Sequence, residues 1–329
     1  MRRRFLTPLL YNFATWFVFA TTLHAQADVK KIELGRALFS DAKLSADGTK
    51  SCASCHVPTM LFAENRQTSV GVFNRLGTRN APSLENAADG KTFFWDGRRT
   101  SLNEAVTDPF FTAFEMGLNN NEELFSRLAA NGYAAKFQEA FGSSSRLTEA
   151  EVADALASFI RTIPKMKTIS SGVTATNAES VRRGRLVFFG NGQCASCHQG
   201  GPGQTFTDDA FHPSALGLQD IAADLPALTT RAMSLPSQPR AIVAAIGQTP
   251  KLAELGRFLV TRAPADLNSF RTPSLLHVAR TAPYMHNGTV PTLDKAVDME
   301  VYYRGLATGE SLQVTAAQKA DLVAFLRTL

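Results

Sequence analysis

Two copies of one pentapeptide contain all four cysteines of this 329-residue chain. The sequence C-A-S-C-H occupies residues 52–56 and again residues 194–198. The pattern C-x-x-C-H is the attachment site of c-type haem, in which both thiols bond to the porphyrin and the histidine ligates the iron. We therefore expect two covalently bound haem c groups. The attachment residues are Cys52 and Cys55 with His56 as proximal ligand, and Cys194 and Cys197 with His198 as proximal ligand.

Other uses of paired cysteines fit the chain less well. Two disulfides would suit an exported protein, but all four cysteines lie inside the two pentapeptides. A thioredoxin-like redox pair needs a βαβ context and has no use for the trailing histidine. A zinc site would need further ligands at finger spacing, and His212, His277 and His286 do not supply that spacing.

The first 27 residues have the composition of an export signal. Three arginines at 2–4 precede an uncharged, largely apolar run at 5–23 and a small-residue A-Q-A site at 25–27. This order is typical of a cleaved secretory signal peptide. A proline and an asparagine inside the apolar run would weaken a retained membrane anchor. We predict a signal peptide at 1–27 and a mature protein in the periplasm.

Removal of this segment changes the meaning of the net charge. The full chain carries +5, but three of its 34 basic residues and none of its 29 acidic residues lie in the signal, which leaves +2. The propionates of two haems would take the holoprotein below zero. The basic balance is therefore no evidence for nucleic acid, and we predict no nucleic-acid partner.

The sequence also repeats outside the pentapeptides, which indicates two homologous units in tandem. The repeated segments keep the same order in both halves. They are G-R-A-L-F at 35–39 and G-R-L-V-F at 184–188, P-S-L at 82–84 and 273–275, W-D-G at 95–97 and H-N-G at 286–288, S-L-N-E-A-V at 101–106 and T-L-D-K-A-V at 292–297, and L-A-S-F-I-R-T-I at 156–163 and L-V-A-F-L-R-T-L at 322–329.

The repeats predict an all-α chain of two tandem cytochrome-c-like domains, each with one covalent c-type haem. Helical periodicity places opening helices at 33–39 and 178–188 and closing helices at 150–163 and 316–329. We predict an N-terminal domain at 28–168, a linker at 169–177 and a C-terminal domain at 178–329. The second unit has a longer loop between its pentapeptide and its P-S-L motif, at 199–272 against 57–81, and we expect the units to differ in role there.

Three further motifs give the chain a resemblance to a known family. They are F-F-W-D-G-R at 93–98, F-E-M-G at 114–117 and R-T-A-P-Y-M-H-N-G at 280–288. Together with the two units, they resemble the bacterial dihaem cytochrome c peroxidase family, which includes the MauG enzymes of methylamine utilisation. The resemblance covers essentially the whole mature chain. It implies that the N-terminal haem reacts with peroxide and that the C-terminal haem relays electrons to it.

The resemblance also implies roles for individual residues. Trp95 matches the tryptophan between the haems, and Glu115 matches the distal carboxylate that handles protons. Asn80, with the backbone carbonyls of Thr281 and Pro283, matches an inter-domain calcium site. From the residues alone, a tryptophan is more often a packing residue, and Asn80 would be a turn residue. The phenylalanine-rich surroundings of the Glu115 carboxyl would favour a raised pKa suited to acid–base work.

The first unit departs from the family pattern in two ways. The peroxidases carry a histidine that caps the N-terminal haem iron in the resting state, but no histidine occurs here from Val57 to Ala195. We therefore expect this haem to be open to peroxide without reductive activation. Met60 could substitute as a cap, although such a methionine is more often core filler. A distal glutamine of the family falls on Ala105, which removes one hydrogen-bonding group from the pocket.

The distal ligand of the second haem is a third departure. The family places methionine or, in the MauG group, tyrosine seventeen residues after the calcium-site proline, and this count from Pro283 reaches Glu300. A two-residue insertion would bring Tyr302 to that place. Met299 and Tyr302 are spaced i, i+3 on a helix, so we expect either could face the iron. We favour Tyr302, and expect Tyr302→Phe to change the spectrum of the second haem.

We interpret the chain as a periplasmic dihaem peroxidase that reduces hydrogen peroxide with electrons from a small cytochrome c or cupredoxin. One alternative is a MauG-like enzyme that uses peroxide to oxidise tryptophan or tyrosine side chains of a partner protein. A second alternative is an electron-transfer dihaem cytochrome without catalysis. The family often forms homodimers, so the resemblance includes a homodimer among the expected partners.

Overall fold

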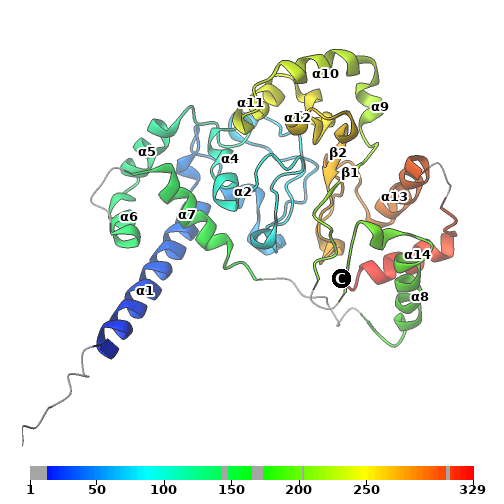
Figure 1. Cartoon of the computed structure of the whole chain (residues 1–329), viewed down its shortest axis with the longest axis horizontal. Coiled ribbons are helices and arrows are strands. Elements are labelled where there is room, and N and C mark those ends of the chain that lie inside the picture. Colours follow the sequence, from blue (N-terminus) through cyan, green and yellow to red (C-terminus); the bar gives the residue numbers. More distant parts are fainter. Residues whose placement is uncertain (1–12, 143–146, 165–172, 202–203, 309–311) are drawn as a thin grey trace, which may run out of the picture.

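The computed structural model describes residues 13–142, 147–164, 173–201, 204–308 and 312–329. These residues are mostly helical and include one pair of three-residue strands (Figure 1). The helices are α1 Phe13–Ser40, α2 Cys52–Cys55, α3 Leu102–Ala105, α4 Asp108–Phe111, α5 Asn121–Ala130, α6 Ala134–Phe141, α7 Glu149–Ile160, α8 Ala178–Phe189, α9 Leu218–Ile221, α10 Leu225–Ser234, α11 Pro239–Gln248, α12 Phe258–Thr261, α13 Leu293–Thr308 and α14 Ala316–Leu326. The strands β1 Phe211–Pro213 and β2 Ser269–Arg271 are antiparallel, with His212 opposite Phe270.

The predicted opening and closing helices are present. The closing helix α7 begins at a capping box, in which Thr148 accepts from the amide of Glu151 while the Glu151 side chain accepts from the amide of Thr148. The closing helix α14 begins with the same arrangement of Thr315 and Gln318. Such caps satisfy backbone donors that a helix start would leave unpaired. Among the described residues the regular elements are helices, with one pair of three-residue strands as the exception. The structure therefore agrees with the prediction of a mostly helical chain.

Each half of the chain builds a separate hydrophobic core. Helices α1, α5, α6 and α7 surround the first core, on one side of Figure 1, and α8, α13 and α14 surround the second, on the other side. Phe39 and Phe110 are fully buried in the first core, and Phe188 is fully buried in the second. The two cores correspond to the two repeated halves of the sequence.

Both cores depend on a glycine where the opening helix crosses the closing helix. A Cβ atom on Gly35 would lie 1.9 Å from the carbonyl oxygen of Ala155, and a Cβ atom on Gly184 would lie 1.9 Å from that of Asp321. Only glycine permits such a close approach of two backbones. Because both glycines start the repeated G-R segments, the sequence repeat is also a repeat of helix packing.

The long interval of the second unit is a folded helical layer rather than a plain loop. Helices α9 to α12 enclose a third core, in which Leu252, Leu255 and Leu259 are fully buried. Figure 1 shows these helices grouped above the space between the two units. Phe114 of the first unit packs against this third core. The extra interval therefore joins the second unit to the first.

Helix α1 includes much of the predicted signal peptide, since it runs without a break from Phe13 to Ser40. Residues 1–12 lie outside the described chain, and cleavage after Ala27 stays a prediction. No helix among the described residues is both long and apolar enough to cross a membrane. The boundaries at 28–168 and 178–329 also stay predictions, because residues 165–172 of the linker region are not described.

Candidate active site

A single cavity of about 1080 Å³ reaches both pentapeptides. This volume exceeds the range of about 300–1,000 Å³ that is usual for one small-molecule site. No two of the four cysteines form a disulfide. Burial raises the pKa of Cys52 to about 12 and that of Cys55 and Cys194 to about 11. The residues of the attachment motifs that line the cavity are Cys52, Cys55, His56, Cys194, Cys197 and His198.

The two motif histidines are held in the same way. Nδ1 of His56 lies 3.1 Å from the carbonyl oxygen of Phe62, and Nδ1 of His198 lies 3.0 Å from that of Phe206. A carbonyl can only accept, so Nδ1 carries the proton and the lone pair is on Nε2. Burial lowers the pKa of both histidines, that of His198 to about 4. Both are therefore neutral imidazoles oriented as metal ligands.

Buried arginines in the cavity wall support a fit to haem. Nε and Nη1 of Arg79, Nε of Arg98 and Nε of Arg271 are buried and have no hydrogen-bond acceptor among the described residues. All three residues line the cavity. A guanidinium stays charged, and a buried N–H without an acceptor is costly. The carboxylates of haem are acceptors of the charge and geometry that these groups need.

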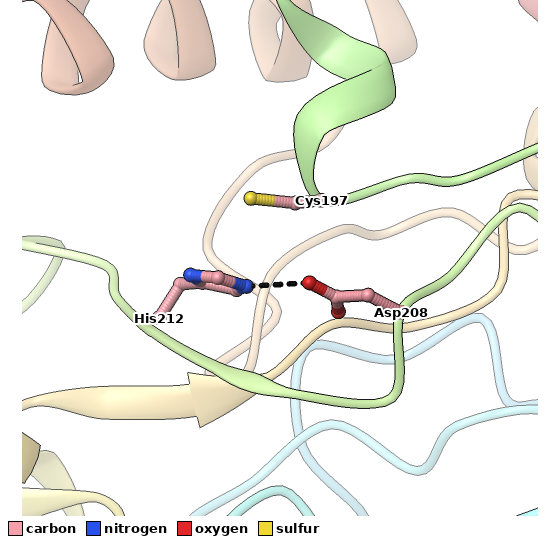
Figure 2. A group of neighbouring side chains, drawn as sticks. All are labelled: Cys197, Asp208 and His212. Carbon is pink, nitrogen blue, oxygen red and sulfur yellow. Dashed lines mark hydrogen bonds and ion pairs between the residues drawn. The ribbon is translucent and has the colours of Figure 1, made fainter.

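A cluster of three potential metal ligands lies beside the second pentapeptide. Ligand atoms of Cys197, Asp208 and His212 lie within 4.8 Å of one another (Figure 2). Nε2 of His212 lies 2.7 Å from Oδ2 of Asp208. The thiol of Cys197 belongs to the attachment motif, so two groups remain, fewer than a tetrahedral zinc site requires. We interpret Asp208 and His212 as a hydrogen-bonded pair at the edge of the second haem site.

Glu115 brings an acid–base group into the cavity. Its backbone is fixed on both sides, because its amide donates to Thr112 and its carbonyl accepts from the amide of Val72, both at 2.9 Å. Its carboxyl has no side-chain hydrogen bond within the described chain. Burial raises the pKa of Glu115 to about 7, against the lowering effect of Arg98 and with a smaller raising effect of Asp108. A carboxyl with this pKa can both accept and donate a proton near neutral pH.

Trp95 lies where the two units meet. Its indole N–H donates to the carbonyl of Asn80 at 2.8 Å, and its own carbonyl accepts from the amide of Arg271 in the second unit at 2.9 Å. Its side chain borders the cavity that contains both attachment motifs. The structure therefore brings Trp95 to the same space as Glu115 and both motif histidines.

The predicted calcium residues Asn80, Thr281 and Pro283 all border this cavity. The side-chain amide of Asn80 donates to the carbonyl of Arg66 at 3.0 Å, so its Oδ1 is the atom able to ligate a cation. The carbonyls of Thr281 and Pro283 accept no backbone hydrogen bond from the described residues. An amide oxygen and two carbonyl oxygens are the donors that Ca²⁺ prefers.

The first-unit departures are consistent with an open pocket. Ala105 borders the cavity and offers no hydrogen-bonding side chain where the family has glutamine. Met60 lies in a 3-10 turn at Pro58–Met60 and does not line the cavity, so it does not occupy the place of a cap. Among the first-unit residues that the structure describes, His56 is the one histidine at the cavity.

The structure does not bring Tyr302 to the second haem site. Its side chain is 63% exposed, and neither it nor Met299 borders the cavity. An α-helix turns by about 100° per residue, so Tyr302 lies about 200° and Met299 about 100° around α13 from Glu300. The face of α13 toward the cavity consists of Leu293, Ala296, Val297, Glu300, Val301 and Arg304.

Glu300 therefore takes the central place on the face of α13 that borders the cavity. Its side chain has a large accessible area because it faces this space, yet protein atoms surround it densely. This desolvation raises the pKa of Glu300, against the opposing charges of Arg304 and His212. The plain count from Pro283 reaches a residue that borders the cavity, whereas a two-residue insertion reaches the exposed side chain of Tyr302. Tyr303 of the same helix also borders the cavity.

Sequence reasoning missed the arginines of the cavity and the contribution of the extra helical layer. Arg98 ends the F-F-W-D-G-R motif, and Arg271 occupies the position of the repeat that Asn80 occupies in the first unit. Their places in repeated motifs were a usable signal. Val243 and Ile246 of α11 also border the cavity. They have no counterpart in the first unit, so the repeat carried no information about them.

Two haem-attachment motifs on one cavity and a carboxyl in that cavity with a pKa of about 7 are the features expected of a c-type haem protein equipped for proton transfer. Residues 29–171 match the family model described as di-haem cytochrome c peroxidase. The methylamine utilization protein MauG of Methylorubrum extorquens is 31% identical over 312 residues, covering 91% of this chain and 78% of that protein. The cytochrome-c peroxidase IdrP1 of Pseudomonas sp. is 32% identical, covering 91% of this chain and 80% of that protein.

The chain therefore belongs to the di-haem cytochrome c peroxidase family, and it is an oxidoreductase of the haem peroxidase class that carries haem c. Solved structures agree with this fold. A MauG-like protein associated with microbial copper homeostasis superposes with a TM-score of 0.69 at 29% identity, covering 91% of this chain and 89% of that one. The diheme peroxidase BthA from Burkholderia thailandensis has the same fold, with a TM-score of 0.71 at 24% identity, covering 91% of this chain and 85% of that one.

Proposed function

We propose that the protein reduces hydrogen peroxide to water in the periplasm, at the haem attached through Cys52 and Cys55. Electrons arrive from a small cytochrome c or cupredoxin and pass through the haem attached through Cys194 and Cys197. The observation that carries this proposal is Glu115, an acid–base group with a pKa of about 7 in the cavity that contains the first attachment motif. A plain electron-transfer cytochrome would have no use for such a group.

Each residue of the first unit has a defined task in this reaction. When bound, haem supplies the iron at which peroxide is cleaved and the redox equivalents for its reduction. His56 would hold that iron through Nε2, because its Nδ1–H is engaged with the carbonyl of Phe62. The Glu115 carboxylate accepts a proton from one peroxide oxygen and delivers it to the other, which can then leave as water. Ala105 adds no competing hydrogen bond.

Trp95 and the calcium residues form one supporting unit in this proposal. Trp95 carries electrons between the two haem sites, since its ring borders the cavity that both motifs share. Its indole N–H is tied to the backbone of Asn80. A Ca²⁺ ion held by Oδ1 of Asn80 and the carbonyls of Thr281 and Pro283 would fix this backbone. Calcium would therefore act on electron transfer by holding Trp95 in place.

For the second haem we propose Glu300, together with His198, as a side chain that would hold the iron. It occupies the middle of the cavity face of α13, whereas Tyr302 lies on the outer surface of this helix. A carboxylate is a hard anionic ligand that stabilises the ferric state, as a phenolate would. This assignment keeps the chemical role expected of Tyr302 and changes the residue that performs it.

Steady-state consumption of peroxide by the haem-loaded protein, with a reduced small cytochrome c or cupredoxin as donor, tests the function. We expect Glu115→Gln to lower the rate by about 10²–10⁴-fold, the usual contribution of a positioned acid–base group. Glu85→Gln is the matched control, because Glu85 also borders the cavity and burial raises its pKa to about 7. Equal losses in the two variants would remove Glu115 from the proposed role.

The MauG-like alternative differs in the electron donor, which would be a tryptophan or tyrosine side chain of a partner protein. The absence of histidine from Val57 to Ala195 favours it, since a haem without a cap needs no prior reduction. Titration of the ferric protein with stoichiometric peroxide distinguishes the peroxidase function from the MauG-like function. A long-lived oxidised spectrum without any donor supports the MauG-like function. Rapid return of the ferric spectrum, with continued turnover once a reduced cytochrome is supplied, supports the peroxidase.

A further inference from the structure

The second unit supplies part of the wall of the first unit's pocket. Val243 and Ile246 of α11 are buried and border the cavity. The same helix packs against the segment that carries Glu115, because a Cβ atom on Gly247 would lie 3.4 Å from the ring of Phe114. Two branched aliphatic side chains therefore stand on the side of the cavity where the acid–base group lies.

An ionic cluster fixes α11 against the first unit. Nε of Arg240 lies 3.3 Å from Oδ1 of Asp108, and the Arg240 guanidinium also bonds the carboxylate of Glu149. The guanidinium carbon lies 4.1 Å from the centre of the Phe111 ring. Asp108 is almost fully buried and also accepts two hydrogen bonds from Arg99, at 2.6 and 2.8 Å. Loss of Arg240 would leave Glu149 without an arginine partner, while Asp108 would stay paired with Arg99, so Arg240 is the residue that ties α11 to this cluster.

We propose that α11 is a size-selective wall, in which Val243 and Ile246 admit hydrogen peroxide beside Glu115 and exclude alkyl hydroperoxides and other bulky iron ligands. The proposal rests on the proposed function, whose substrate class it narrows. Hydrogen peroxide has no substituent beyond its two oxygens, whereas an alkyl hydroperoxide must place a hydrocarbon group where these side chains stand. Apolar branched groups discriminate by volume alone, because they offer no hydrogen bonds.

Optical titration of the ferric, haem-loaded protein with cyanide and with imidazole tests the wall without turnover. We expect Ile246→Ala and Val243→Ala to strengthen imidazole binding relative to cyanide by about tenfold or more, the effect of removing methyl groups from a fitted pocket. The matched control is Ile242→Ala, because Ile242 is buried in the same helix and does not border the cavity. An unchanged ratio in both wall variants would overturn the proposal.

A second measurement compares hydrogen peroxide with cumene hydroperoxide as oxidant. The wild type should consume the first and not the second, and the wall variants should gain activity with the second. Failure of the wild type to consume hydrogen peroxide would refute the proposed function, while the ligand titration would still report on the wall. Equal rates of the wild type with both oxidants would refute the wall alone.

Arg240→Ala tests the ionic cluster, because this side chain does not border the cavity. We expect it to shift the imidazole-to-cyanide ratio in the same direction as Ile246→Ala, since α11 would move away from the first unit. Arg240→Lys keeps the charge and should recover part of the selectivity. A folded Arg240→Ala protein with the wild-type ratio would show that the ionic cluster does not position the wall.

Discussion

The two haem units use the same backbone contacts to hold different side chains. The amide of Asn80 in the first unit donates to the carbonyl of His286 in the second, and the amide of Arg271 in the second donates to the carbonyl of Trp95 in the first, both at 2.9 Å. These four residues occupy equivalent positions of the repeat. Because the contacts are made by the main chain, they constrain the fold without constraining the side chain that each position carries.

The side chains at the equivalent positions have diverged. Trp95 borders the cavity between the motifs. His286 is buried, stacks on Phe270 with ring centroids 3.6 Å apart, and lies 2.8 Å from Oε2 of Glu254. His286 also borders the cavity, so both equivalent positions contact the shared space. The difference is that the side chain of His286 is tied to the helical layer through Glu254, whereas the indole of Trp95 donates to the backbone of Asn80.

The side chains that border the cavity also differ between the first and the second unit. In the first unit, Glu115 has a pKa of about 7 and Ala105 borders the same cavity without a hydrogen-bonding side chain, so this pocket can transfer protons. The second unit has Glu300, with the charged Arg304 one helical turn away on the same face of α13. We infer that duplication produced one site for reaction and one for electron storage, with the same attachment chemistry in each.

Removing the proximal ligands should give the largest difference between the units. We expect His56→Ala to reduce the reaction with peroxide to background, because its iron ligand is lost. His198→Ala should still react once with peroxide but should lose turnover with the donor. Rapid-mixing spectroscopy and steady-state consumption measure the two steps. If His198→Ala abolished the first reaction and His56→Ala did not, the roles of the units would be reversed.

The pH dependence of the peroxide reaction should distinguish the pockets next. The pKa of Glu115 is raised by burial to about 7, so the carboxylate that accepts a proton is lost as the pH falls below this value. The second-order rate should fall by about tenfold for each pH unit below 7, as a single titration requires. Glu115→Gln should remove this inflection. A profile that kept it would assign the titration to another group.

The fold was more predictable than the site, for physical reasons. Helices α8 and α14 each carry a segment that is repeated in the first half of the sequence. The same helical pattern is therefore seen twice, and each occurrence makes the other a more secure prediction. The helical layer at α9 to α12 has no copy and was predicted only as a loop. The preference for Tyr302 rests on its chemical type, whereas the phase of the helix puts Glu300 on the cavity face of α13 and leaves Tyr302 exposed. Side chains on one helix point in directions that a shift of two residues almost reverses.

The helix-crossing glycines should show where the units remain alike. Gly35→Ala and Gly184→Ala each place a methyl group against a backbone carbonyl at 1.9 Å, so the helices must separate. We expect each to lower the free energy of unfolding by about 1–3 kcal/mol or more, as overpacking does. Denaturant titration of the haem-loaded protein measures this change. Gly132→Ala is a less crowded comparison, with no atom within 4 Å of the added group.

A loss confined to one of the two crossing variants would contradict the equivalence of the crossings. Gly132 itself has a positive φ of 76°, so Gly132→Ala carries a backbone cost of its own. The loss of unfolding free energy in Gly132→Ala therefore measures backbone strain without steric overlap. The losses in Gly35→Ala and Gly184→Ala must be larger than this if the close approach of the helices is the dominant effect.

The smallest effect should come from Tyr302, and it sharpens the assignment of the second haem. Tyr302→Phe removes a hydroxyl from a side chain that is 63% exposed, so the haem spectrum should not change. The free energy of unfolding should stay within about 0.5 kcal/mol of the wild type. Glu300→Gln keeps the size of a side chain that borders the cavity but removes its negative charge. It should change the optical and EPR signals of the second haem and leave those of the first unchanged. A spectral change in Tyr302→Phe with none in Glu300→Gln would mean that α13 rotates by about half a turn when haem binds, since only that movement exchanges the two faces.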